Sequence, residues 1–255
     1  MAGRLQGKVA LISGGATGMG GAASRLFAAE GASVGIVDRN EGAGLVLVEE
    51  IRKAGGTAVF AQADVSRASE VTRAVESIGA ALGTIGILFN HAGTIIIKPF
   101  LETTEEDYDR LMDVNVRSMF LMTKAVLPQM IAAGGGAIVC TSSISGIVAT
   151  PMEVLYSTTK GACHMFARAI AVDFRDKGIR CNAVCPGFVR TPHGLREVKE
   201  LTALGVDMSD AALAASQGRI CEPEEVARAA LFLASDEASF INGAHLFVDN
   251  GFTAV

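Results

Sequence analysis

The fold is decided by residues 13–20, which read Ser13-Gly14-Gly15-Ala16-Thr17-Gly18-Met19-Gly20. An apolar run precedes this stretch and a helical pattern follows it. Gly14, Gly18 and Gly20 take the spacing GxxxGxG. Glycine permits strained turn dihedrals and lets backbone N–H groups approach a pyrophosphate at a helix N-terminus. A glycine run alone also fits an ordinary tight turn, but between a strand and a helix it predicts dinucleotide binding by Gly14, Thr17, Gly18, Met19 and Gly20.

Short apolar runs alternate with longer helical patterns along the chain. Seven of these runs read as buried strands, at residues 8–13, 33–37, 57–61, 86–89, 137–140, 179–185 and 244–248. Runs of Val, Ile and Leu without alternation are typical of strands buried on both faces, as in a parallel sheet. The pattern predicts an α/β fold in which a doubly wound, parallel, seven-stranded sheet carries helices on both faces. No linker or repeat divides residues 1–255, so we expect a single domain.

Several helix boundaries are also predicted. Apolar residues at three- and four-residue spacing indicate helices over Glu41–Ala54 and Arg67–Leu82. Residues 103–106, Thr-Thr-Glu-Glu, form a capping box that predicts a long helix towards Ala133. A further helix is expected from the region of Tyr156 to about Lys177, and Pro223 suits a first helical turn. Residues 191–221 lack a strand and carry short helical signals; this segment is a surface connection or a substrate lid, and its length favours the lid.

Composition excludes several classes of protein. Half of the 255 residues are hydrophobic and 19% are charged, which favours a large core over disorder. The net charge of −5 and the pI of about 5.4 disfavour nucleic-acid binding. No apolar stretch approaches the roughly 20 residues of a membrane span, and the N-terminal apolar run is too short for a signal peptide. We therefore expect a cytoplasmic protein that binds neither nucleic acid nor membrane.

The sequence predicts no metal site. The five cysteines are scattered through apolar surroundings, and the four histidines show no metal-ligand spacing. Most such cysteines are small buried hydrophobes.

Asp38 bears on the choice of cofactor. It ends the second predicted strand, 18 residues after Gly20, where a carboxylate accepts hydrogen bonds from a ribose diol. A 2′-phosphate would bring like charge against it, and a unit pair at ~4 Å costs about 4 kcal/mol at an effective dielectric of 20. Arg39 is the contrary feature, because an arginine can clamp a 2′-phosphate. The carboxylate favours NAD over NADP, with Arg39 solvated or stacked on adenine.

Tyr156 and Lys160 predict the chemistry. Their four-residue spacing on a helix places a phenol and an ammonium on one face. They also fit an ordinary amphipathic surface, but hydroxyl-bearing residues 141–143 end the neighbouring predicted strand. A base near pH 7 requires the pKa of Tyr156 to fall about three units, which a cation at ~4 Å can supply. A tyrosine general acid/base tuned by a lysine follows.

These motifs, in this order, resemble the short-chain dehydrogenase/reductase family over essentially the whole chain, in its short single-domain branch with a Rossmann-type fold. The matched positions are Ser13, Gly14, Gly18, Gly20, Asp64, the run Asn90-His91-Ala92-Gly93, Asn115, Ser143, Tyr156, Lys160, Pro186, Gly187 and Thr191. Two departures stand out: His91 replaces a usual asparagine, for which we expect a structural role, and Asn250 replaces a usual glycine near the C-terminus.

The resemblance implies a role for each matched residue. Tyr156 would exchange the proton of the alcohol, while Lys160 would hold the nicotinamide ribose and lower the pKa of Tyr156. Ser143 would hydrogen-bond the substrate oxygen. Asn115 would position a water that links Lys160 to solvent. The remaining cofactor contacts would come from Asp64 and Val65 at the adenine, Asn90, Ala92 and Gly93 at the adenosine ribose, and Pro186, Gly187, Val189 and Thr191 at the nicotinamide.

The substrate pocket is expected to be mostly apolar. Glu153 is the exception: it accepts hydrogen bonds from a polyol or sugar, or, as the sequence slightly favours, stabilises a helix N-terminus. The lid's cations, Arg196, Lys199 and Arg219, form no evident phosphate site. Candidate apolar wall residues are Ile95, Ile96, Ile144, Ile147, Met152, Leu155, Leu195 and Val198, with Ile95, Ile147 and Glu153 taken as the substrate contacts besides Ser143.

Three functions remain open on the sequence. The first is an NAD-dependent dehydrogenase that interconverts a secondary alcohol and a ketone, acting on a polyol, sugar, cyclic alcohol or hydroxysteroid-like compound. The second is a 3-oxoacyl thioester reductase, which the acidic pI and Asp38 disfavour. The third is a dinucleotide sensor without turnover, which the intact set Ser143, Tyr156 and Lys160 disfavours. The resemblance also implies a homotetramer or dimer built on the long Asn115 and Tyr156 helices.

Overall fold

Seven parallel strands form one sheet in the computed structural model, which describes residues 3–254. Their order across the sheet is β3-β2-β1-β4-β5-β6-β7, so the predicted doubly wound sheet is confirmed. Each predicted strand is present to within a residue or so at its ends. The bounds are β1 Val9–Ser13, β2 Ser33–Asp38, β3 Thr57–Gln62, β4 Ile87–Asn90, β5 Gly136–Thr141, β6 Ile179–Pro186 and β7 His245–Val248.

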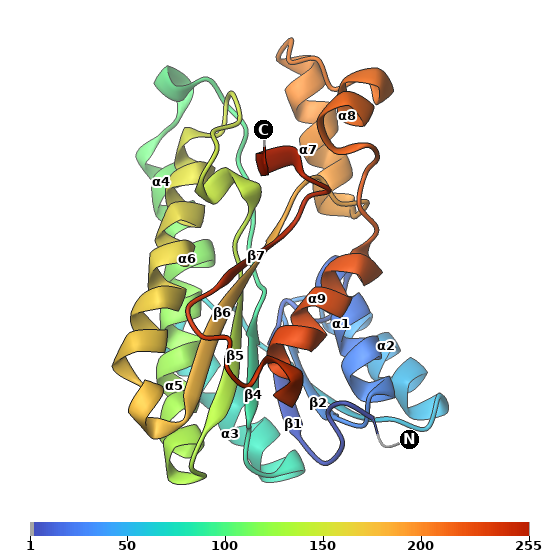
Figure 1. The fold of residues 1–255 in the computed structure, drawn as a ribbon, viewed down its shortest axis with the longest axis vertical. Helices are drawn as coiled ribbons and strands as arrows, with labels where there is room; N and C mark the ends of the chain where they lie inside the picture. The colour runs from blue at the N-terminus through green and yellow to red at the C-terminus, as the bar shows by residue number, and fades with distance from the viewer. Residues whose placement is uncertain (1–2, 255) are drawn as a thin grey trace.

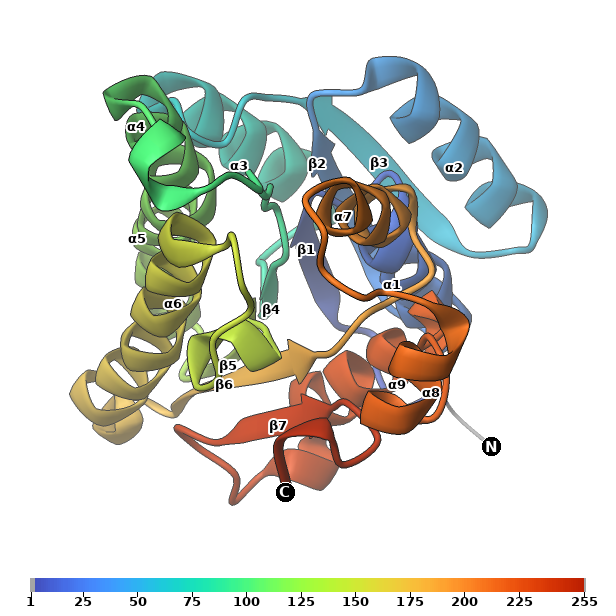
Figure 2. The same cartoon turned by 90° about the horizontal axis from the view of Figure 1, so that it is seen from above.

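Helices cover both faces of the sheet in a three-layer, Rossmann-type single domain (Figure 2). One face carries α1 (Gly18–Ala29), α2 (Glu41–Lys53) and α9 (Pro223–Ala234), and the other carries α3 (Ala68–Leu82), α5 (Ser118–Ala132) and α6 (Val154–Asp173). The apolar spacing explains the packing: in α3 the buried residues Val71, Ala74, Val75 and Ile78 recur every three or four positions. Each face therefore has its own hydrophobic core.

The sheet reverses its winding direction at β1. This strand pairs with β2 on one side and with β4 on the other. In open α/β sheets such a reversal leaves a crevice at the carboxyl ends of the strands. The glycine stretch therefore lies beside that crevice, directly after Ser13.

The long helix differs from its prediction at both its start and its middle. Its capping box uses Thr104 and Asp107 rather than residues 103 and 106, because the Thr103 hydroxyl donates to the carbonyl of Phe100 at 2.7 Å and closes a separate 3₁₀ turn. Helix α4 then runs over Glu105–Met112, and a π-helical turn over Asp113–Arg117 joins it to α5. Similarly, α6 ends at Asp173, and a 3₁₀ turn occupies Arg175–Lys177.

Two helices stand above the carboxyl ends of the strands (Figure 1). They are α7 (Pro192–Ala203) and α8 (Asp210–Gln217), within the segment that was expected to lack a strand. Only an isolated bridge, Val189 to Cys221, ties the segment's two ends together in the manner of a sheet. Its apolar side chains, Leu201 and Leu213 among them, pack into a third small cluster that includes Tyr156. The segment is therefore packed over the carboxyl ends of the strands, and its role as a lid stays a prediction.

Within residues 3–254, no helix has the length and apolar character that a bilayer span requires.

Candidate active site

A cavity of about 570 Å³ opens at the carboxyl ends of the strands. It reaches from the glycine stretch, past the ends of β4 and β5, to α7. Most of the predicted site residues line it. Those in the lining are Gly14, Thr17, Gly18, Met19, Asp38, Arg39, Asp64, Val65, Ala92, Gly93, Ser143, Tyr156, Lys160, Pro186, Gly187, Val189 and Thr191.

The glycine loop is built for a close backbone approach. Gly14 and Gly18 have left-handed φ angles of 66° and 54°. A Cβ at Gly20 would lie 2.0 Å from the carbonyl oxygen of Gly14, so only glycine fits there. Gly20 thus shapes the loop without lining the cavity. The N-cap residue Thr17 makes no side-chain capping bond, which leaves the first N–H groups of α1 available to a phosphate.

Asp38 links two segments in the lining of the cavity. Its carboxylate accepts from the N–H of Ala16 at 3.2 Å and from the N–H of Asn40 at 3.0 Å. Arg39 is exposed and also lines the cavity. These bonds fix the carboxylate beside the glycine loop, where the sequence placed a diol acceptor.

Asp64 and Val65, the residues predicted to contact adenine, line the cavity. Burial opposes ionisation of Asp64, but hydrogen bonds from Ser66 and the Arg67 guanidinium lower its pKa below the ordinary value. Asn90 lies behind the cavity instead of in its lining: its amide donates to Thr123 Oγ1 at 2.9 Å.

The part of the cavity where nicotinamide contacts are predicted is held by a residue that the sequence did not single out. Gln217 of α8 accepts from the N–H of Phe188 at 2.9 Å and donates to its carbonyl at 2.8 Å. It therefore orders the segment between Gly187 and Val189, both of which line the cavity. This role depends on contact between the segment after β6 and α8, which lie far apart in the sequence, so no local sequence pattern indicates it.

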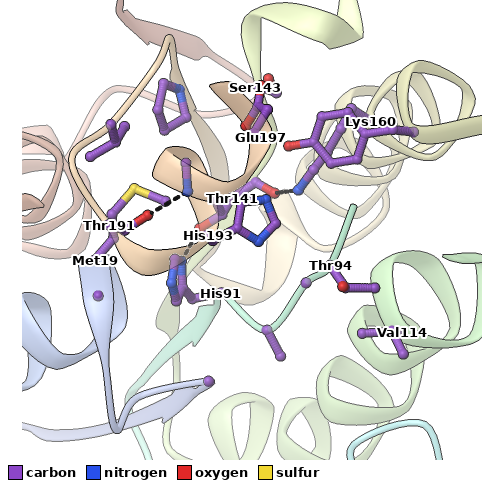
Figure 3. Close-up of a pocket in the computed structure, with 18 of the residues that line it drawn as sticks. Met19, His91, Thr94, Val114, Thr141, Ser143, Lys160, Thr191, His193 and Glu197 are labelled. Carbon is purple, nitrogen blue, oxygen red and sulfur yellow. Dashed lines mark hydrogen bonds between the residues drawn. The ribbon is translucent and has the colours of Figure 1, made fainter. Parts of the chain in front are cut away.

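The three predicted catalytic side chains meet in the cavity, Ser143 from the end of β5 and the other two from α6. All three are buried. The ammonium of Lys160 donates to the carbonyl oxygen of Thr141 at 3.0 Å, as Figure 3 shows, and lies 5.5 Å from the centroid of the Tyr156 ring. Asn115 is buried behind them and donates to Thr159 Oγ1 at 3.0 Å.

The pKa of Tyr156 departs from the prediction. Burial raises it well above its ordinary value, and the carboxyl groups of Glu197 and Glu153 raise it further, whereas a hydrogen bond from Ser143 lowers it. Lys160 alone does not bring the pKa down, because desolvation of the phenolate and two acidic neighbours oppose it.

His91 serves the framework of the site. Its Nδ1 lies 2.9 Å from Thr141 Oγ1, and its ring packs on Phe89 with centroids 5.2 Å apart. The side chain also lines the cavity. Burial, with repulsion from Lys160 and His193, lowers its pKa to about 3, so the imidazole is neutral.

The predicted substrate contacts divide into two groups. Ile95 is buried in the small cluster formed with α7 and α8, Ile147 is largely exposed, and neither lines the cavity. Glu153 occupies the N-cap position of α6, at the helix terminus that the sequence favoured, but its side chain makes no capping hydrogen bond. Its carboxyl instead lies within hydrogen-bonding reach of Glu197 on α7.

Glu197 and His193 line the cavity but were not singled out from the sequence. Both lie in α7, whose placement over the strand ends depends on tertiary packing. Among residues 3–254, no three His, Cys, Asp or Glu side chains gather into a group that could hold a metal ion.

Comparison with known proteins agrees with this geometry. Residues 14–253 match a family model described as "Enoyl-(Acyl carrier protein) reductase". Cyclopentanol dehydrogenase of Comamonas sp. (strain NCIMB 9872) is 43% identical over 99% of both chains. The 2,5-dichloro-2,5-cyclohexadiene-1,4-diol dehydrogenase LinX of Sphingobium indicum is 38% identical, again over 99% of both chains.

Solved structures show the same fold. Levodione reductase superposes with a TM-score of 0.94 at 29% identity, over 98% of this chain and 99% of that one. A gluconate 5-dehydrogenase from Burkholderia cenocepacia, solved with NADP and tartrate, superposes with a TM-score of 0.90 at 35% identity, over 99% of this chain and 97% of that one.

Proposed function

The chain belongs to the short-chain dehydrogenase/reductase family, and from this premise we propose that it is an NAD(H)-dependent dehydrogenase of a cyclic secondary alcohol. Like its relatives, the protein is an oxidoreductase that acts on CH–OH groups with a nicotinamide dinucleotide. The preference for NAD, the roles of the site residues and the substrate class are the parts proposed.

The observation that carries the proposal is the convergence of Ser143, Tyr156 and Lys160 in the cavity that also contains the glycine loop. A dinucleotide seated on that loop fits the lining, because a left-handed Gly14 and an uncapped α1 leave room and N–H donors for phosphates. The opposite end of the cavity reaches the tyrosine. Cofactor and alcohol can therefore meet at one point.

In oxidation, the bound dinucleotide supplies the hydride acceptor. The Ser143 hydroxyl would hold the alcohol oxygen. Tyr156, ionised with the help of Lys160 and of the positive charge of an oxidised nicotinamide, would take the proton as hydride leaves the carbon and the C=O bond forms. Lys160 provides the cation that stabilises the phenolate, and its bond to Thr141 keeps the ammonium in place. In reduction, the Tyr156 hydroxyl returns the proton to the forming alkoxide.

Asp38 supports NAD over NADP. Its two bonds to backbone N–H groups hold the carboxylate at the ribose end of the cavity. A 2′-phosphate there would meet like charge. The similar gluconate 5-dehydrogenase from Burkholderia was solved with NADP, so the activities of this enzyme with NAD and with NADP have to be compared directly.

A cyclic substrate is supported by the two relatives that act on a cyclopentanol and a cyclohexadiene diol. The cavity near Tyr156 has apolar surface from Ile144 and Phe188. Such walls suit the hydrocarbon part of a ring.

We also propose a homo-oligomer built on the long helices. Phe120 of α5 and Met165 and Val172 of α6 are each about half exposed or more. Apolar side chains clustered on neighbouring helices mark an interface. Light scattering that returned a monomer would contradict this assembly.

Tyr156→Phe tests the proposed mechanism. With cyclopentanol and NAD, kcat is expected to fall by about 10²–10⁴, because the proton acceptor is lost. NADH binding, followed by its fluorescence, is expected to be retained. Tyr108→Phe, at an exposed tyrosine on α4, is the matched control. Alcohol oxidation unchanged by Tyr156→Phe would overturn the mechanism.

A further inference from the structure

Glu153 is a buried acid whose hydrogen bonding is incomplete. Its residue is fully buried, and Oε2 lies 3.5 Å from Ser145 Oγ, a long hydrogen bond. Oε1 has no donor among the described residues. The preceding residue, Met152, has a left-handed φ of 65°, which is strained for a side chain of this kind. The backbone at Met152 is thus held in an unfavourable conformation, and the carboxyl group of the next residue, Glu153, lies in the protein interior.

The group that faces this carboxyl is another carboxyl. Glu197, half-buried on α7, lines the cavity, points towards the Ser143 side of it in Figure 3, and lies within hydrogen-bonding reach of Glu153. Two carboxylates offer no hydrogen to each other. A single proton shared between the two carboxyl groups joins them by a hydrogen bond and leaves one negative charge on the pair.

The other charged and titratable groups nearby do not replace that proton. Arg196, beside Glu197 on α7, is engaged elsewhere: it donates to the carbonyl of Ile95 at 3.2 Å and lies 3.6 Å from Glu200. On α6, Lys160 is bonded to Thr141, and Tyr156 is an acid itself. Burial raises the pKa of Glu153 to about 7 and raises that of Glu197 well above its ordinary value. Both directions agree with a retained proton.

We propose that Glu197, positioned by a proton shared with Glu153, accepts a hydrogen bond from a second hydroxyl of the substrate, so that the enzyme prefers uncharged cyclic diols or hydroxyketones. The inference rests on the proposed function, since Ser143 and Tyr156 must hold the reacting oxygen. Glu197 touches substrate through the oxygen that the shared proton leaves free, and Glu153 acts only through Glu197.

The same arrangement excludes acidic substrates. A pair with one negative charge repels a substrate carboxylate placed at the second position. A diol gains a hydrogen bond to a charged acceptor, whereas a simple cyclic alcohol leaves that acceptor without a partner. The preference among substrates therefore depends on the charge of the substrate and on whether it carries a second hydroxyl.

The test compares cyclohexanol, the 1,2-, 1,3- and 1,4-cyclohexanediols and 3-hydroxycyclohexanecarboxylate as substrates of the intact enzyme. At least one diol is expected to exceed cyclohexanol in kcat/KM by tenfold or more, mainly through a lower KM, and the carboxylate is expected to be the poorest. Glu197→Leu is expected to bring kcat/KM of the diol close to that of cyclohexanol. The ratio of the two is the readout, because loss of this carboxyl also affects the pKa of Tyr156. Glu200→Leu, one turn further along α7, should keep the wild-type preference.

The outcomes separate two failures. If wild type oxidises cyclohexanol and all diols alike, or Glu197→Leu lowers both by one factor, this inference is wrong and the proposed function stands. If wild type oxidises none of these alcohols with NAD or NADP, the proposed function and the inference fall together.

The shared proton has its own readout. Wild type at neutral pH is expected to show the infrared C=O stretch of a protonated carboxyl, which the double variant Glu153→Gln/Glu197→Gln should lack. Glu153→Gln alone still has an N–H donor towards Glu197, so it should retain the diol preference. Because this variant has no shared proton to lose, its kcat/KM ratio of diol to cyclohexanol should stay constant between about pH 6 and 8, whereas that of wild type should change. Identical spectra of wild type and double variant would overturn the shared proton.

Discussion

Asn115 and the backbone of Thr94 are joined by two hydrogen bonds. Asn115 Oδ1 accepts from the N–H of Thr94 at 2.7 Å, and Nδ2 donates to its carbonyl oxygen at 2.8 Å. With its further bond to Thr159, the asparagine ties the loop after β4 to α6, one residue before Lys160. The π-helical turn that contains Asn115 turns its side chain inward between these two elements.

Asn115→Ala tests this junction. We expect the free energy of unfolding to fall by about 1–3 kcal/mol, because two backbone groups of Thr94 lose their partner. Turnover should fall at least tenfold, since Gly93 and Lys160 are no longer held together. Urea denaturation and steady-state kinetics measure both.

Ser157→Ala is the control for this change. Ser157 Oγ is buried and has no partner among the described residues, so its removal should leave the free energy of unfolding unchanged or slightly increased. Wild-type stability in Asn115→Ala would contradict the structural role.

Gly20→Ala addresses the glycine loop. The new Cβ would lie 2.0 Å from the Gly14 carbonyl oxygen and 2.7 Å from the His91 ring, so the loop must move. We expect a loss of about 2 kcal/mol or more in unfolding free energy and at least tenfold weaker NADH binding, by fluorescence titration. Gly79→Ala is the counterpart: no atom lies within 4 Å of its Cβ, and an alanine in α3 should stabilise by about 0.5–1 kcal/mol. Equal behaviour of the two variants would refute the steric argument.

The sequence predicted the fold nearly completely because its signals are local. Strand β1, Val9–Ser13, is buried along its length and is apolar up to its last residue, and α3 carries a clear three- and four-residue spacing. The capping box and the π turn were missed because each depends on a competing bond. Thr103 bonds to Phe100, and Asn115 bonds across to Thr94.

Site residues that belong to a sequence motif could be predicted. Site residues whose positions depend on tertiary packing could not. The glycine loop and the Tyr156 helix were located by spacing. Glu197 and Gln217 belong to α7 and α8, whose placement no spacing encodes, and the carboxyl of Glu197 helps to raise the pKa of Tyr156. Ile147 was placed near the substrate by sequence proximity, yet its loop turns it outward.

Asp38→Asn tests the cofactor preference. Removing the charge should raise kcat/KM with NADP relative to NAD by about 10–100-fold, because like-charge repulsion of a few kcal/mol is lost. The asparagine still accepts one backbone hydrogen bond, so the loop should persist. Asp207→Asn, an exposed site away from the cavity, is the control. A wild-type enzyme as active with NADP as with NAD would remove the basis of the argument.

His91 makes stability depend on pH. Its pKa is about 3 in the folded protein against 6.5 in an exposed imidazole, because burial and the Lys160 and His193 charges oppose protonation. Below pH 6.5 the unfolded chain therefore binds a proton that the folded chain does not, and stability falls as pH drops from 6.5 towards 3. His91→Asn cannot titrate and retains a partner for Thr141. Between pH 7.5 and 5, urea denaturation should show it losing about 2 kcal/mol less than wild type. Equal losses in the two proteins would mean that the imidazole takes up its proton in the folded state as easily as in the unfolded chain.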